Sequence, residues 1–196
     1  MEGVTIRSVC VFCGSSAAVP EPHRRAASDL GALLARHGIT LVFGAGRVGL
    51  MGLVAEAVLD AGGRAIGVIP RHLTHVEPPH ARLTELHVVE TMHERKFKMF
   101  QLSDAFVTLP GGMGTLDETI EIITWKQLRL HGKPIVIVDV ERYWAPLAAL
   151  FESIIAAGYA RPEHGALYTV VDRVDDVLAA LARVPEPAFA AKDRLI

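Results

Sequence analysis

Short apolar runs alternate along this chain with longer segments in which apolar residues recur at helical spacing. Runs such as Ile135-Val136-Ile137-Val138 are continuously apolar, which is typical of parallel strands covered on both faces. Strands are expected at residues 6–13, 40–45, 64–69, 85–90, 105–109 and 134–140, and helices at 22–37, 50–62, 92–103, 114–130 and 143–158. A late apolar run, 167–171, precedes a last predicted helix at 174–184. This alternation predicts an α/β fold, a doubly wound, Rossmann-like domain with a mainly parallel sheet flanked by helices.

The composition narrows the class of protein without revealing its activity. Of 196 residues, 51% are hydrophobic and 21% charged, and the formal net charge is −2. These values predict one globular domain over residues 1–184, followed by a C-terminal tail at 185–196. The mixed charges give no basic face for nucleic acid. No apolar run has the length of a membrane span and the start lacks a signal-peptide pattern, so we expect a cytoplasmic protein.

The two cysteines, Cys10 and Cys13, form a C-x-x-C pattern that invites a redox or zinc interpretation. Both lie in a predicted strand, where residues three apart point to opposite faces, so the thiols are not expected to meet. A structural zinc site would also need a second pair of ligands, which the spacing of the other residues does not provide. We therefore expect two buried core cysteines, with no metal site.

The stretch Pro110-Gly111-Gly112-Met113-Gly114-Thr115-Leu116-Asp117-Glu118 follows a predicted strand and opens a predicted helix. Glycines allow a ligand to approach the backbone, and the N–H groups at a helix N-terminus favour an anion such as phosphate. Glu118 adds a carboxylate about one turn later. The alternative is structural, because Thr115 and Glu118 also match a capping box. Capping does not require three glycines, so the functional interpretation of Glu118 is favoured.

A second glycine-rich turn, Gly44-Ala45-Gly46-Arg47-Val48-Gly49, matches G-x-G-x-x-G between a strand and a helix. A dinucleotide site would also have an acidic residue at the end of the next strand, and that strand ends instead in Pro70-Arg71. NAD(P) binding is therefore a weaker hypothesis than mononucleotide binding, and a tight turn that packs a helix is an equally good explanation. A third turn contains Ser15, which can donate to a ligand or cap the turn.

Met92, Arg95 and Lys96 share one face of a predicted helix. The basic pair could meet a sugar-phosphate, with the methionine against a base. A solvated charged face beside core methionines is the alternative, and it is the usual meaning of this pattern.

Met92-His93-Glu94-Arg95-Lys96, together with the 110–118 motif, resembles the "lonely guy" (LOG) family of cytokinin riboside 5′-monophosphate phosphoribohydrolases. Segments 13–16, 44–46, 67–70, 103–105 and 124–128 match as well, so the resemblance covers about residues 8–160. Met113 and Asp117 stand at positions where the family often has an aromatic residue and glutamate. Relatives were long labelled lysine decarboxylases, but no lysine here lies in a recognisable pyridoxal-phosphate site.

The resemblance implies hydrolysis of the N-glycosidic bond of a nucleoside 5′-monophosphate, an AMP with or without an N6 substituent, without a cofactor or metal. It implies Arg95 and Glu118 as the catalytic pair. The implied substrate-binding residues are Met92, Lys96, Gly111, Gly112, Gly114, Thr115 and Ser15. It also implies a homodimer with its active site near the subunit interface, to which the segment containing Trp125 contributes. The loop containing His72, His75 and His80 is where substrate preference is expected to differ. A non-catalytic nucleotide-binding or sensing module on the same fold is the main alternative, followed by a dehydrogenase.

Overall fold

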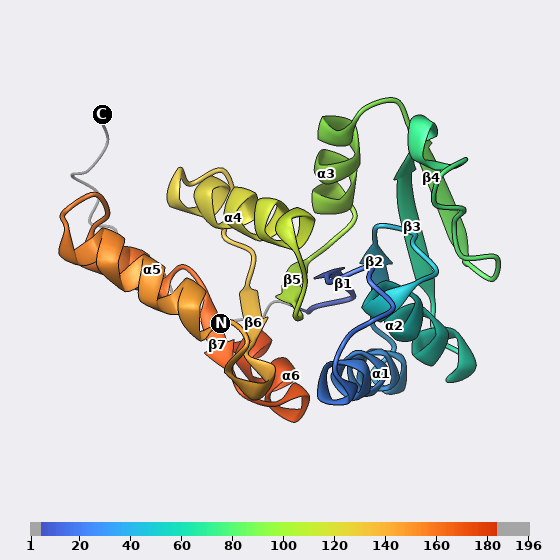
Figure 1. The fold of residues 1–196 in the computed structure, drawn as a ribbon, viewed down its shortest axis with the longest axis horizontal. Coiled ribbons are helices and arrows are strands. Elements are labelled where there is room, and N and C mark those ends of the chain that lie inside the picture. Colours follow the sequence, from blue (N-terminus) through green and yellow to red (C-terminus); the bar gives the residue numbers. More distant parts are fainter. Residues whose placement is uncertain (1–4, 184–196) are drawn as a thin grey trace.

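The computed structural model describes residues 5–183, which form a single parallel sheet with helices on both faces (Figure 1). All neighbouring strands pair in parallel. In this part of the chain the sheet has seven strands in the order β4-β3-β2-β1-β5-β6-β7. They are β1 (Ser8–Phe12), β2 (Thr40–Phe43), β3 (Ala65–Pro70), β4 (Glu85–Val89), β5 (Ala105–Thr108), β6 (Ile135–Val138) and β7 (Thr169–Val171). The predicted α/β fold is confirmed.

Two groups of helices cover the sheet. The helices are α1 (Glu21–Arg36), α2 (Gly49–Asp60), α3 (Met92–Gln101), α4 (Met113–Gln127), α5 (Ala145–Ala156) and α6 (Val177–Ala182). One buried layer joins the sheet to α1, α2 and α6, and the other joins it to α3, α4 and α5. This arrangement explains why the central strands are apolar at most positions, since alternate side chains enter different layers.

The cysteines illustrate this alternation. Cys10 packs in the layer beneath α3 and α4, whereas Cys13, just beyond the end of β1, packs in the layer with α1 and α2. Both are buried and free. The prediction that the C-x-x-C pattern places two thiols in the core, on opposite faces of the sheet, is confirmed.

Several predicted element boundaries move by a few residues. The helix predicted at 114–130 ends at Gln127, and Arg129 (φ 60°) then turns the chain toward β6. The last predicted helix begins as a 3₁₀ turn, Val174–Asp176, before α6. The predicted tail, 185–196, lies outside the described residues. No helix among residues 5–183 combines the length and apolarity that crossing a bilayer requires.

Candidate active site

The strand order reverses between β1 and β5, so the chain leaves these neighbouring strands in opposite directions along the sheet. In open α/β sheets, ligands bind beyond the carboxyl ends of strands at such a reversal. Gly14 follows β1 and the 110–114 glycine segment follows β5, and the two turns are joined by a bond from the Gly14 N–H to the Pro110 carbonyl at 3.0 Å. The turn after β2 and the loop after β3 reach the same place, where they line one cavity with these two turns.

Helix α4 begins at this cavity without a protein cap. Its N-cap residue is Gly112, and no side chain bonds the N-terminal N–H groups. The first turn of a helix leaves such groups without intrahelical partners, which suits an anion. Thr115 lies inside this turn, so Thr115 and Glu118 do not form the capping box that their spacing allows. A Cβ at Gly112 or Gly114 would meet no protein atom within 4 Å, so the space beside both residues is open.

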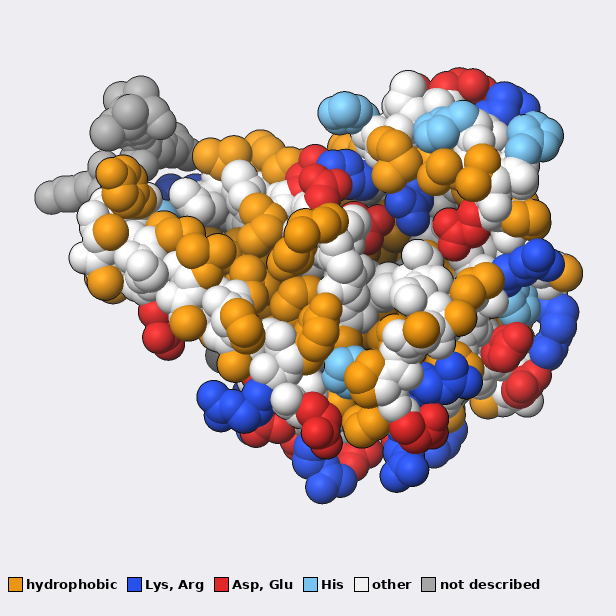
Figure 2. Space-filling model, viewed as in Figure 1, with side chains coloured by type: hydrophobic (Ala, Val, Ile, Leu, Met, Phe, Trp, Pro, Cys, Tyr) orange, Lys and Arg blue, Asp and Glu red, His pale blue; other side chains and the backbone are white. Residues whose placement is uncertain are grey.

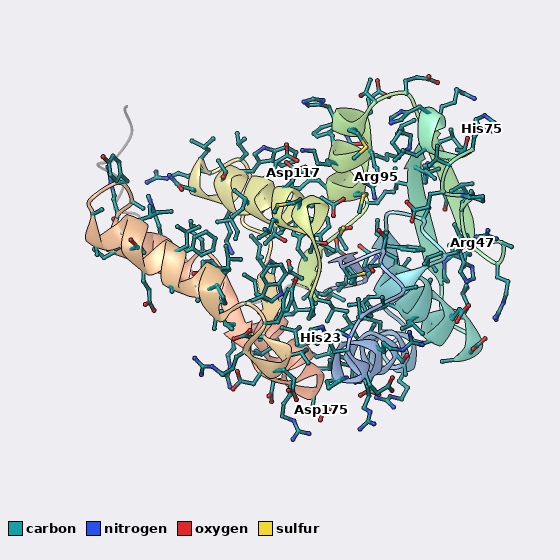
Figure 3. All side chains as sticks on the ribbon, viewed as in Figure 1. His23, Arg47, His75, Arg95, Asp117 and Asp175 are labelled. Carbon is teal, nitrogen blue, oxygen red and sulfur yellow. The ribbon has the colours of Figure 1, made fainter. Side chains whose placement is uncertain are left out.

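Glu118 pairs with Arg95, which reaches it from α3. The distance from Arg95 Nη1 to Glu118 Oε1 is 3.2 Å, and the two side chains are only 12% and 11% exposed. Arg95 Nε also donates to the Val68 carbonyl of β3 at 3.1 Å. Figure 3 shows Arg95 directed from α3 toward the ends of the strands. The two residues that the motifs singled out are therefore in direct contact within a sheltered site.

Burial raises the pKa of Glu118 from its ordinary value to about 7. Desolvation disfavours the charged carboxylate and outweighs the opposing effect of Arg95, while the neighbouring Asp117 raises the pKa further. A carboxyl group with this pKa can exchange protons near neutrality, as a general acid or base requires. Such perturbed groups in clefts often mark functional sites.

The glycines of the second motif make room for the protein's own side chains. A Cβ at Gly44 would lie 1.9 Å from Arg95 Nη2, and one at Gly46 would lie 2.8 Å from a carboxylate oxygen of Glu77. The N-terminus of α2 is also occupied, because the Gly14 carbonyl accepts from the N–H groups of Leu50 and Met51. The donors that a dinucleotide pyrophosphate would need are therefore taken, which removes the main support for the dehydrogenase hypothesis.

These elements enclose a cavity of about 280 Å³. Of the predicted site residues, it brings together Arg95, Glu118, Gly112, Gly114, Thr115 and Ser15. It is also lined by residues that sequence reasoning did not select, namely Cys13, Gly14, Gly44, Met51, Ile69, Leu73, Glu77 and Met113. Glu77 gives the cavity a second carboxylate. It comes from a long irregular loop whose sequence carries no periodic signal.

Three predicted residues do not line this cavity. Lys96 instead bridges α3 to α4 through ion pairs with Asp117 and Glu121, both at 3.1 Å. Figure 3 shows Asp117 on the side of α4 that faces α3. Met92 is half-buried as the first residue of α3. Gly111 lines a neighbouring cavity, and a Cβ there would lie 2.1 Å from Thr115 Oγ1. Lys96 therefore ties α3 to α4 beside the site.

The histidines of the loop after β3 lie away from the reacting pair. His72 and His75 are exposed, and Figure 3 shows His75 at the outer edge of the molecule. His80 is buried, and its backbone N–H donates to the Ala45 carbonyl at 2.9 Å. Leu73 and Glu77, rather than the histidines, carry this loop into the cavity.

Residues 51–181 match the family model described as "Possible lysine decarboxylase". The chain is 42% identical over 178 residues to the cytokinin riboside 5′-monophosphate phosphoribohydrolase of Rhodococcoides fascians, covering 90% of each protein. It is 43% identical over 162 residues to an Arabidopsis thaliana enzyme of the same name, covering 83% of this chain and 75% of that one. The chain belongs to the LOG family.

Solved structures with a similar fold were also found for this LOG-family chain. The molybdenum cofactor carrier protein of Chlamydomonas reinhardtii superposes with a TM-score of 0.69, at 23% identity, over 92% of this chain and 98% of that one. A molybdenum cofactor binding protein of Rippkaea orientalis gives a TM-score of 0.68 at 19% identity, covering 90% and 95% of the two chains. These similarities show a shared architecture.

The description "lysine decarboxylase" does not fit the site of this LOG-family chain. Pyridoxal-phosphate enzymes attach their cofactor to a lysine as a Schiff base. No lysine among the described residues lines the cavity, and Lys96 is held outside it by two carboxylates. The residues that line the cavity therefore do not fit pyridoxal phosphate.

Proposed function

We propose that this protein hydrolyses the N-glycosidic bond of nucleoside 5′-monophosphates, releasing a free base and ribose 5-phosphate. AMP and N6-substituted AMP are the proposed substrates, and the N6-substituted forms are the cytokinin precursors. The observation that carries the proposal is the combination, in one cavity, of an uncapped helix N-terminus with a buried Arg95–Glu118 pair. The first binds a phosphate and the second supplies a carboxylate with a pKa near neutrality. Relatives that are 42–43% identical bear the name of this activity.

In this proposal, one end of the cavity binds the phosphate and the other end acts on the ribose. The N–H groups at the start of α4 and the Thr115 hydroxyl hold the phosphate, which places the ribose beside Glu118. Breaking the bond between C1′ and the base builds positive charge on the ribose, which the ionised Glu118 carboxylate stabilises. The bonding electrons leave with the base. A water oxygen bonds to C1′, and Glu118 accepts a proton from that water. The departing base takes a proton from solvent, and Glu118 returns its own proton to solvent before the next turnover.

Arg95 stays protonated and therefore cannot act as the base. Its guanidinium holds Glu118 in place at 3.2 Å and is itself fixed by the Val68 carbonyl. The Glu77 carboxylate lies in the same cavity and is suited to accept hydrogen bonds from ribose hydroxyls.

The test is incubation with AMP, N6-prenylated AMP and adenosine, with chromatography of the released base. We expect both monophosphates to be cleaved and adenosine to be a poor substrate, because binding energy at the phosphate aids the distant bond cleavage. Equal turnover of AMP and adenosine would contradict the role of the phosphate. A tight complex with AMP that yields no product would favour a nucleotide-binding or sensing module.

Replacing Glu118 with Gln should abolish this activity while the protein remains folded. The amide keeps the size of the carboxyl group and can still accept from Arg95, so we expect at least a ~10³-fold loss of kcat from the missing carboxylate. The melting temperature should be unchanged or higher, because the ionised carboxylate is costly to bury. Retained turnover would show that Glu118 has only a structural role.

We further propose that the protein acts as a homodimer through the exposed face of α4 and α5. Hydrophobic side chains gather over these helices in Figure 2, and Met113, Leu128 and Leu150 are 84%, 61% and 54% exposed. Met113 also lines the cavity, so a partner seated here would shelter the site.

The two cysteines of this protein, Cys10 and Cys13, are free and buried, which fits a reducing compartment. We therefore propose that the protein acts in the cytoplasm.

Sedimentation analysis tests the dimer. The wild-type chain should sediment with the mass of two 21.2 kDa chains. Leu150→Asp places a charge on a half-exposed position and should yield a folded monomer. A wild-type monomer at micromolar concentration would contradict the proposal.

A further inference from the structure

The Tyr143 hydroxyl donates a hydrogen bond of 2.6 Å to the carbonyl of Gly111, in the glycine segment that opens α4. Tyr143 lies 32 residues later in the chain, in the loop between β6 and α5. None of the sequence motifs includes it. Its hydroxyl therefore reaches the backbone of the glycine segment from outside the candidate active site.

A second cavity, of about 480 Å³, lies on the Tyr143 side of this turn. Gly111 and Tyr143 line only this cavity, whereas Gly112 lines both this one and the candidate active site. The peptide plane between Gly111 and Gly112 therefore forms part of the wall between the two spaces.

In this peptide, the direction of the Gly111 carbonyl fixes the direction of the Gly112 N–H. No cis peptide bond occurs in the described residues, and in a trans peptide the carbonyl and the following N–H point in opposite directions. Because Tyr143 holds the Gly111 carbonyl toward the second cavity, the Gly112 N–H is turned toward the candidate active site. There it joins the other free donors at the start of α4.

The orientation of this peptide depends on an outside contact because both residues that it joins are glycines. Gly111 cannot carry a side chain, since a Cβ would lie 2.1 Å from Thr115 Oγ1. Glycine leaves the backbone free to rotate, so the peptide can turn its N–H away from the site unless its carbonyl is bound.

Tyr143 is itself well fixed. Its ring makes edge contacts with His23, at 5.2 Å between centroids, and with Trp144, at 4.9 Å. The two residues before it, Glu141 and Arg142, have φ values of 54° and 59°. Left-handed backbone at two successive non-glycine residues is strained, and strain of this kind clusters at functional sites.

We propose that Tyr143 is a positioning residue that orients the Gly112 N–H toward the phosphate of the substrate. The proposal rests on the proposed function, because it assigns the phosphate to the start of α4. It predicts that the hydroxyl of Tyr143 contributes to the binding of every phosphorylated ligand, without touching the ligand.

The test is Tyr143→Phe, which keeps the ring and removes only the hydroxyl. We expect KM for AMP and the inhibition constant of ribose 5-phosphate to rise together by about tenfold, in line with one lost charge-assisted hydrogen bond, while kcat changes less than twofold. The slow turnover of adenosine, which has no phosphate, should be unchanged. Tyr159→Phe is the matched control, because Tyr159 is 89% exposed and lies outside both cavities.

An unchanged KM and inhibition constant would overturn the proposal. A fall in kcat for AMP and adenosine alike would also overturn it, since that pattern indicates a general structural role. Calorimetric titration with inorganic phosphate separates this proposal from the proposed function. If the wild-type protein cleaves no nucleotide, a tenfold weaker phosphate affinity in Tyr143→Phe still supports the role of Tyr143, and equal affinity overturns it.

Discussion

Two glycine-rich turns in this protein have similar sequence patterns, but the space beside their glycines is used differently. Both follow a strand and open a helix at the carboxyl edge of the sheet, one at Gly44–Gly49 and the other at Pro110–Gly114. At the first turn, the spaces beside Gly44 and Gly46 are filled by side chains, and the Gly14 carbonyl occupies the helix N-terminus. At the second, the spaces beside Gly112 and Gly114 are open and the helix has no cap.

The difference teaches that the role of a glycine motif depends on which atoms occupy the space where a Cβ would lie. In the first turn the glycines make room for the side chains of Arg95 and Glu77, and in the second they leave open space for the proposed ligand. A pattern search treats the two alike, because the occupants come from α3 and from the loop after β3, far away in the sequence. Three glycine substitutions test this contrast, and a pH profile then tests Glu118 itself.

Gly44→Ala should have the largest effect, and on catalysis alone. The new Cβ would lie 1.9 Å from Arg95 Nη2, so the flexible guanidinium must move away from Glu118. We expect kcat for AMP to fall by ~10²- to 10³-fold, the loss typical of removing one positioned charge-stabilising group. Thermal unfolding should change little, because the displaced atom is the end of a side chain. Normal activity in a folded Gly44→Ala variant would break the comparison.

A pair of substitutions separates scaffold from ligand contact. Gly49 has φ 66°, and a Cβ there would lie 2.5 Å from the Ser15 carbonyl carbon, so Gly49→Ala should destabilise the protein by ~1–3 kcal/mol. Gly114→Ala meets no protein atom and improves helix propensity, so its stability should be equal or higher. Its Cβ enters the proposed phosphate site and should raise KM for AMP by roughly tenfold, or about 1.4 kcal/mol.

Denaturant titrations and steady-state kinetics on both variants measure this contrast. If Gly49→Ala weakened AMP binding without destabilising the fold, the first turn would contact ligand as well. If Gly114→Ala left KM unchanged, the phosphate would not lie at the start of α4.

The pH profile should show the smallest effect. Burial raises the pKa of Glu118 to about 7, and each proposed role of this residue requires the ionised carboxylate. Because the protonated form predominates below the pKa, kcat/KM should rise with pH through about 7 and then level off. Between pH 6.5 and pH 7.5 the change should be about threefold. A fall in kcat/KM over this range would mean that the protonated acid is the active form.

The sequence was sufficient for the parts of the molecule that depend on local pattern. Continuous apolar runs predicted the parallel strands, and the spacing of Arg95 and Glu118 from their motifs, with the family resemblance, predicted a pair that the structure joins at 3.2 Å. The start of α4 was also predictable, since the glycines precede the helix directly.

What could not be predicted depends on contacts between distant segments. Lys96 shares a helix face with Arg95, but the acidic residues of α4 hold it outside the cavity. Glu77 enters from an irregular loop, and Tyr143 reaches the glycine segment from beyond β6. No periodicity or motif reports such side chains, because their positions are set by the order of the strands.

If the phosphate binds as proposed, the uncapped start of α4 makes the substrate part of the helix itself. Thr91 supplies the N-cap of α3 by accepting from the Glu94 N–H at 3.1 Å, and α4 has no such residue. A bound phosphate would supply the missing cap, so the free energy of binding and the stability of this helix turn are linked. The nucleotide would therefore complete a secondary-structure element before it reacts, and release of ribose 5-phosphate would return that element to its unfinished state.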